Sequence, residues 1–131
     1  MNEKVKKKMF TFEIRLSRMK SGSSLGDKNF DIITIAGYLK EEMNIITYGL
    51  GKEVTSSAQV YIDGADMSKV DAKDLVTVGI RKKVEHNEDS ENSDEIIETE
   101  FVPILSDRQI LRRDNFYRPN NVPDVGVIYL A

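Results

Sequence analysis

The chain has 131 residues, a hydrophobic share of 40% and a formal net charge of −3, so we expect a single domain, 1–131, with a modest core. The absence of cysteine excludes disulfides, thiolate metal sites and cysteine nucleophiles. Because no apolar run approaches the length of a membrane span, and the basic first residues lead into an alternating segment rather than a signal-peptide core, we expect a soluble intracellular protein without a membrane partner.

Short segments of strand character recur along the whole chain. The clearest is FTFEIRLSR, in which apolar and polar side chains alternate so that the four apolar residues share one face, as in a half-buried strand. The same reasoning, from alternation or from β-branched residues between turn signals, predicts strands at 10–18, 29–39, 44–49, 54–64, 75–85, 95–105 and 125–131. The strand at 95–105 is expected to be interrupted at Pro103.

Two segments carry helix signals. Residues 66–74 predict one helical turn with Asp66 as its N-cap, and residues 106–116 predict a short helix capped by Ser106 or Asp107. Because strands separated by turn signals dominate, we expect an all-β, mainly antiparallel fold. It would be a small β-barrel or a sandwich, with long loops and one or two short helices.

The charges are unevenly distributed along the chain. Residues 1–20 contain seven Lys or Arg against two Glu, whereas residues 84–107 contain nine Asp or Glu and no Lys or Arg. The extremes are a basic N-terminal segment, 1–9, and an acidic loop, 85–98. This asymmetry favours a surface with two electrostatic faces, which suits stacking on a charged partner.

The acidic run EHNEDSENSDEIIETE, residues 85–100, has three interpretations. A calcium loop starting at Asp89 would need glycine at its sixth position, where Asp94 stands, and it would need flanking helices that are not predicted. The simplest interpretation is a solvated loop between two strands. The third is an interface loop whose carboxylates meet a basic partner or repel a nucleic acid backbone. The candidate residues of this loop are Glu88, Asp89, Glu91, Asp94 and Glu95.

Catalytic signals are weak. The single histidine, His86, lies inside the acidic run, so a nucleophile–base pair is hard to build. SGSSLGDK, residues 21–28, lacks the GxxxxGK[ST] spacing of a phosphate-binding loop and has the composition of a flexible connector. We therefore predict no enzyme activity, no catalytic residue, no metal and no cofactor; a hydrolase or metal enzyme would require a bound ion.

Two basic clusters are candidate interfaces. One is KVKKKMF, residues 4–10, and the other contains the arginines near Phe116. Either cluster has the charge to contact phosphates through counterion release, although the simpler interpretation is a surface complementary to an acidic neighbour. The candidate residues are Lys6, Lys7, Lys8, Arg112 and Arg113.

The stretch GLGKEVTSSAQVYIDGADMSKVDAKDLVTVG, residues 49–79, resembles the small head-completion or head–tail connector (stopper, minor capsid) proteins of tailed bacteriophages. In that family a strand of the form v-S-S-a-x-V-Y is followed by a short variable piece and by x-x-D-x-I/V-x-v. The matching residues are Ser56, Ser57, Val60, Tyr61, Asp74, Leu75 and Val76. The basic N-terminal segment and the acidic insert at 85–98 depart from the family pattern.

The resemblance implies a β-barrel that forms a homo-oligomeric ring, expected to be twelve-fold, in the neck of a virion assembled in the bacterial cytoplasm. Its partners would be portal and adaptor proteins above, tail proteins below and packaged DNA in the channel. Such a ring closes the channel with a loop between its second and third strands, which corresponds here to 40–53. The candidate channel residues are Glu41, Glu42, Asn44, Tyr48, Lys52 and Glu53. The alternative is a monomeric OB-like β-barrel module that binds nucleic acid.

Overall fold

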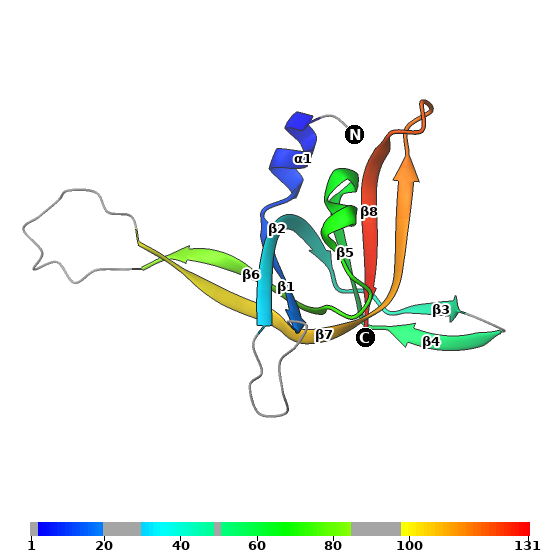
Figure 1. Ribbon diagram of the computed structural model, residues 1–131. Helices are drawn as coiled ribbons and strands as arrows, with labels where there is room; N and C mark the ends of the chain where they lie inside the picture. The colour runs from blue at the N-terminus through cyan, green and yellow to red at the C-terminus, as the bar shows by residue number, and fades with distance from the viewer. Residues whose placement is uncertain (1–2, 20–29, 49–50, 85–97) are drawn as a thin grey trace, which may run out of the picture.

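The computed structural model describes residues 3–19, 30–48, 51–84 and 98–131. Six strands close an antiparallel barrel in the order β1-β2-β5-β8-β7-β6, and β3 and β4 form a separate two-stranded sheet (Figure 1). In chain order the elements are α1 (Glu3–Met9), β1 (Phe12–Met19), β2 (Phe30–Lys40), β3 (Asn44–Tyr48), β4 (Lys52–Ser56), β5 (Ala58–Asp63), the 3-10 helix η1 (Gly64–Lys69), β6 (Leu75–Lys83), β7 (Thr99–Tyr117) and β8 (Pro123–Leu130). The predicted all-β, mainly antiparallel fold with one or two short helices is confirmed, and it is a barrel.

Neither helix of the described residues has the length and apolar character needed to cross a bilayer. Both are short: α1 has seven residues and η1 has six. They lie at the same end of the barrel (Figure 1), where η1 closes the mouth with Met67. The Met67 side chain packs directly against Gly126 of β8, in the space that the Cβ of any larger residue would occupy. A glycine at this position therefore allows Met67 to pack there.

The barrel interior is filled by one face of each strand. Ile14 and Leu16 are fully buried, as the alternation in FTFEIRLSR predicts. They pack in one cluster with side chains from the other barrel strands and from the η1 region. The remaining buried members are Ile35, Leu39, Ala58, Val60, Ile62, Met67, Val70, Val76, Val78, Ile128 and Leu130. Because successive strand residues face opposite sides, their neighbours point outward.

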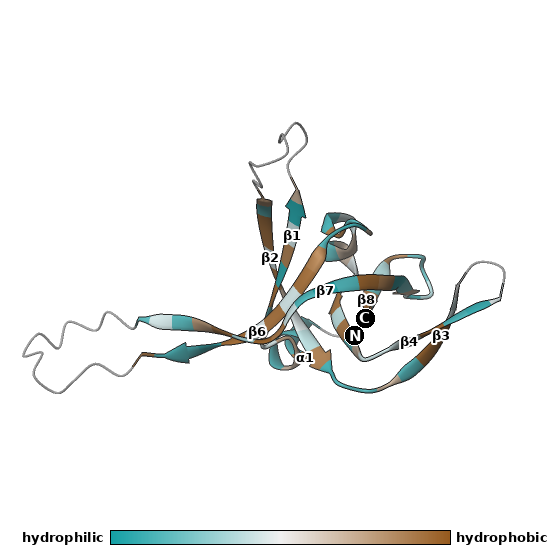
Figure 2. Cartoon of the chain, turned by 90° about the horizontal axis from the view of Figure 1, so that it is seen from below, coloured by the Kyte–Doolittle hydropathy of each residue, from teal (hydrophilic) through white to brown (hydrophobic). Residues whose placement is uncertain are grey.

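Several strands are longer than the barrel wall. β2 pairs with β1 along residues 30–37 but with β5 only along 37–40. β7 pairs first with β6, through 99–109, and then with β8, through 110–117. The outer parts of the β1–β2 and β6–β7 hairpins therefore leave the barrel as two-stranded ribbons. Together with β3–β4 they extend in three directions (Figures 1 and 2).

The helix predicted at 106–116 is wrong, because these residues belong to β7. Asp107 adopts a positive φ of 50°, and its backbone N–H donates a hydrogen bond to Thr77 Oγ1 at 3.1 Å. The register shifts at this point between Val76 and Val78, which is the signature of a β-bulge. The bulge re-aims the strand from β6 toward β8, and this long-range pairing outweighs the local capping signal.

The strand interruption predicted at Pro103 is also wrong. Pro103 pairs with Gly79 inside β7, next to a second register irregularity. Proline lacks a backbone N–H and is tolerated at bulges and on strand edges. Along 99–107, β7 pairs with β6 alone among the described strands, so its other edge has no ladder for the proline to break.

Two further boundaries differ from the predictions. The strand predicted at 54–64 is two strands, β4 and β5, that belong to different sheets and are separated by Ser57. The helical turn predicted at 66–74 is η1, and its N-cap is Asp63, whose side chain accepts a hydrogen bond from the N–H of Ala65. Asp66 lies inside the helix. Hydrophobic periodicity cannot detect a change of sheet along a continuously extended segment.

Arg18 of β1 fixes the loop between η1 and β6. Its guanidinium donates to both carboxylate oxygens of Asp74, at 2.9 and 3.0 Å, and to the carbonyl oxygen of Lys69 at 2.9 Å. Asp74 is 1% exposed and also accepts the N–H of Asp71 at 2.9 Å. Arg113 of β7 donates to the carbonyl oxygen of Val70 at 2.7 Å. This loop is thereby tied to strands on two sides.

Replacing Asp74 with alanine removes these hydrogen bonds, leaves the N–H of Asp71 without its acceptor and deprives Arg18 of its carboxylate partner. We expect Asp74→Ala to lower the free energy of unfolding by about 2–4 kcal/mol, measured by urea denaturation. The matched control is Asp114→Ala, because Asp114 pairs with the half-exposed Arg112 at 3.0 Å and its loss should cost less than about 1 kcal/mol. Equal effects of the two substitutions would contradict the assignment of Asp74 as a buried clamp.

Candidate functional site

The β3–β4 hairpin, here called the arm (44–56), leaves the barrel between its second and third strands in chain order, β2 and β5. Asn44 pairs with Ser56 at the base of the arm. Within the described residues, the arm strands pair only with each other. The segment predicted to close a channel, 40–53, therefore contains the connection from β2 and most of the arm, and it is built as a hairpin.

The structure brings the six candidate channel residues onto this projecting segment. Glu41 and Glu42 lie in the connection, Asn44 and Tyr48 are the first and last residues of β3, and Lys52 and Glu53 begin β4. Glu42 forms an ion pair with Lys40 at 2.7 Å, and this hydrogen bond and charge raise the pKa of Lys40. The glutamates and Lys52 are exposed, so the segment presents charge to whatever surrounds it.

Polar side chains lock the root of the arm to the C-terminal strand. The Ser56 hydroxyl lies 2.8 Å from the carbonyl oxygen of Leu130 and 2.9 Å from that of Ala58. Gln59, 1% exposed, donates from Nε2 to the carbonyl oxygen of Glu42 at 2.8 Å. These contacts give the serine-rich strand of the quoted motif a structural role, because they hold the arm where β4 passes into β5.

The two faces of the arm differ in environment. Ile46 is 4% exposed, whereas Ile45 on the opposite face is 72% exposed. Beside β3 lies a cleft of ≈ 230 Å³ that is lined by Asn44, Ile45, Ile46, Arg112 and Tyr129. Partial burial is the largest influence on Tyr129 and raises the pKa of its hydroxyl. The arm therefore covers part of the barrel wall with one face and offers the other to solvent.

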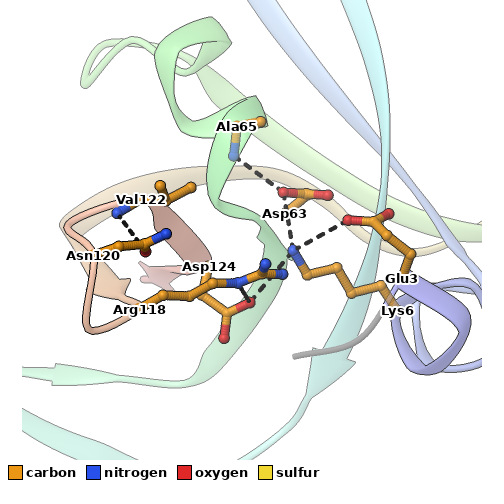
Figure 3. Close-up of polar contacts among 8 residues, drawn as sticks. All are labelled: Glu3, Lys6, Asp63, Ala65, Arg118, Asn120, Val122 and Asp124. Atoms are coloured by element: carbon orange, nitrogen blue, oxygen red, sulfur yellow. Dashed lines mark hydrogen bonds and ion pairs between the residues drawn. The ribbon is translucent and has the colours of Figure 1, made fainter.

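Lys6, a predicted interface residue, is used inside the molecule. Its side chain points from α1 toward the barrel and is 5% exposed. The ammonium lies 3.3 Å from Asp63, 3.5 Å from Asp124 and 3.9 Å from Glu3 (Figure 3). A buried charge needs such partners to offset its desolvation. Lys6 thus anchors α1 to the barrel end and is not presented to a neighbour.

The other basic candidates occupy separate places. Lys7 and Lys8 are exposed on α1, whereas Arg112 and Arg113 lie on β7. Arg112 pairs with Asp114, and Arg113 donates to the loop after η1. The structure therefore does not merge the two basic clusters into one cationic surface among the described residues.

A charged cluster on the outer face of β1, β6 and β7 was not predicted. Glu13 receives hydrogen bonds from Arg15 and from Arg81, each at 2.9 Å. The Arg15 guanidinium carbon stacks 3.8 Å above the ring centre of Phe101, a cation–π contact. Partial burial alone would raise the pKa of Glu13, but the two guanidinium groups outweigh it and lower that pKa below 4.5. The cluster ties three strands together.

Residues 85–97 lie outside the described part of the chain. They include His86, most positions of the hypothetical calcium loop, and the acidic-loop candidates Glu88, Asp89, Glu91, Asp94 and Glu95. Among the residues that the structure describes, no group of three or more His, Cys, Asp or Glu side chains is arranged to hold a metal ion.

Comparison of the chain with protein-family models, with curated proteins and with solved structures found no match.

Sequence reasoning missed the buried polar contacts. Nothing in the sequence distinguishes Lys6 from the neighbouring lysines. Only the fold shows that Lys6 is the lysine that forms an ion pair with Asp63. Asp74 did belong to the quoted family pattern, and an aspartate directly before the apolar run LVTV was the available hint of a buried carboxylate. Its partner Arg18 is 56 residues away, and no local pattern connects the two.

The Glu13 cluster makes a prediction about pH. The pKa of Glu13 is lowered in the folded state. The stability that ionised Glu13 contributes is therefore fully present above pH 4.5, and it is lost as the pH falls through the folded-state pKa. We expect Glu13→Gln to lower the free energy of unfolding at pH 7 by about 1 kcal/mol and to flatten its decline below pH 4.5, measured by urea denaturation across pH. Glu42→Gln, in an exposed pair, is the control. A parallel pH dependence of the Glu13 variant and the unsubstituted chain would refute the assignment.

Proposed function

We propose that this chain is a structural protein of a tailed-phage virion. In this proposal, copies of the barrel form a ring in the head–tail neck, between portal and adaptor proteins on one side and tail proteins on the other. The ring closes the channel around packaged DNA and offers a docking surface for the tail. The proposal combines the resemblance of residues 49–79 with the architecture of the barrel and its arm.

The observation that carries this proposal is the position of the arm. The connector resemblance predicts a projecting element between the second and third strands, and the arm emerges between β2 and β5. Its root is fixed by Ser56 and Gln59, so its direction is set by the barrel. An element held in this way suits a ring, in which every copy must present the same segment to the central axis.

The chemistry of the arm supports the same role. Segment 40–53 carries Glu41, Glu42 and Glu53 against Lys40 and Lys52. A surface in which carboxylates outnumber basic groups repels phosphates, and DNA slides past such a surface more readily than it binds. An isolated two-stranded hairpin is also only marginally stable in water, so the arm gains from contact with neighbouring copies.

The alternative, a monomeric OB-like module that binds nucleic acid, receives less support from the placement of basic groups. Lys6 is buried against carboxylates, and Arg15 and Arg81 are both bonded to Glu13. Affinity for nucleic acid depends mainly on cations that are free to meet phosphates. The alternative remains a prediction, and a salt-sensitive affinity of the purified monomer for single-stranded DNA would favour it.

Localisation in particles tests the proposal. Antibodies raised against the purified chain would be applied, with gold labels, to tailed particles made by the organism whose genome encodes it. We expect label at the junction of head and tail, because a ring there is accessible from the side. Particles lacking the gene provide the control for background. Label along the tail or over the capsid, or particles free of the protein, would reject the neck role.

A further inference from the structure

Three clefts formed by described residues differ in the charge of their walls. In two of them, carboxylates line the cleft together with basic groups. The acidic members are Glu13 in one cleft, of ≈ 310 Å³, and Glu3, Asp63 and Asp66 in the other, of ≈ 250 Å³. The third is the ≈ 230 Å³ cleft beside β3, and among the described residues no carboxylate lines it. This third cleft is therefore the one whose wall charge favours an anion.

The polar groups of this cleft are mainly hydrogen-bond donors. Arg112 of β7 and Tyr129 of β8 are cross-strand partners, so their side chains lie on the same face of the barrel wall. A guanidinium only donates hydrogen bonds, and a phenolic hydroxyl and the NH₂ group of an asparagine also donate. Partial burial raises the pKa of Tyr129, which keeps its hydroxyl protonated at neutral pH. Together with Asn44 these groups offer a set of donors to one acceptor.

Arg112 has the capacity to bind a second carboxylate. Its side chain is 47% exposed, and its Nε atom donates to Asp114 Oδ1 at 3.0 Å. Among the described residues this is the hydrogen bond that the guanidinium makes, so its two terminal nitrogens can serve another acceptor. An exposed pair of this kind contributes little stability, whereas a guanidinium that holds a carboxylate through two parallel hydrogen bonds forms one of the stronger polar contacts in proteins.

The size and the surroundings of the cleft favour a side chain of a partner protein. Its ≈ 230 Å³ lies below the range of about 300–1,000 Å³ that is usual for small-molecule sites. Ile45 and Ile46 also line it and can contact the methylene groups of an entering side chain. Met43 and Ile45, two residues apart on the arm segment, are 76% and 72% exposed. Exposed apolar side chains beside a polar pocket are the kind of surface that a protein partner covers.

We propose that this cleft receives the carboxylate of a glutamate side chain from another protein chain. Arg112 and Tyr129 donate hydrogen bonds to the carboxylate, and Met43 and Ile45 are covered by the surface around it. The longer stem of glutamate, compared with aspartate, allows contact with both isoleucines of β3. The root of the arm is fixed by Ser56, so the cleft exists before the partner arrives, which lowers the cost of binding. The inference does not depend on the neck location, because one chain forms the whole cleft.

A peptide titration tests the assignment. The tripeptide Gly-Glu-Gly, acetylated and amidated at its ends, would be added to the ¹⁵N-labelled chain while the backbone amide NMR signals are followed. We expect shifts confined to residues 44–46, 112 and 129 and a dissociation constant on the order of 1 mM, because the probe supplies a single side chain. The uncharged Gly-Gln-Gly peptide should bind at least about tenfold more weakly. Equal binding of the two peptides, shifts elsewhere, or inorganic phosphate binding as tightly as the glutamate peptide would overturn the proposal.

Three variants provide the second measurement. Arg112→Gln should weaken binding of the glutamate peptide at least about tenfold, and Asp114→Asn should strengthen it, because it removes the carboxylate that shares the guanidinium. The matched control is Arg81→Gln. Arg81 is also half exposed, at 45%, and paired with one glutamate, but it lies outside this cleft, so binding should be retained. Unchanged binding by Arg112→Gln, weaker binding by Asp114→Asn, or an equal loss with Arg81→Gln would contradict the assignment.

These results separate the cleft from the neck role. Specific binding of the glutamate peptide together with an absence of neck label would support the cleft and reject the location. Neck label together with a failure of the peptide to bind would support the location and reject the cleft.

Discussion

The main constraint on this molecule is the mismatch between strand length and barrel wall. β2 meets β5 through only four residues, 37–40, and β7 divides its length between two partners. A barrel closed in this way leaves ribbons outside itself. The core satisfies the hydrophobic requirement of folding, whereas the ribbons carry exposed apolar residues that the core does not use. The projecting shape and the candidate interfaces both result from this division.

Buried polar contacts turn these projections into oriented elements. Ser56 and Gln59 fix the root of the arm, Asp74 and Arg18 hold the loop after η1, and Lys6 secures α1. Each contact places a polar group where burial without a partner would be costly. The barrel therefore presents its arm in a defined direction, which the proposed ring would require.

The sequence allowed prediction of the fold class and of the barrel-facing residues, because alternation in segments such as 10–18 reports directly which face is buried. It did not allow prediction of the points at which a strand changes the neighbouring strand with which it pairs. The bulge at Asp107 and the break at Ser57 arise from pairing with distant strands, so local capping and periodicity gave a helix and a single strand instead. The candidate site was located as a segment, 40–53, but its hairpin form and the internal use of Lys6 depend on contacts between residues far apart in the chain.

Amide hydrogen exchange of the purified chain tests the account most directly, because it reports backbone pairing residue by residue. The account predicts that residues 37–40, where β2 pairs with β5 and closes the barrel, are protected, and that the arm, whose strands pair only with each other among the described residues, exchanges faster. Rapid exchange at 37–40 would contradict barrel closure. Protection of residues 44–48 equal to that of 37–40 would contradict the description of the arm as a separate two-stranded sheet.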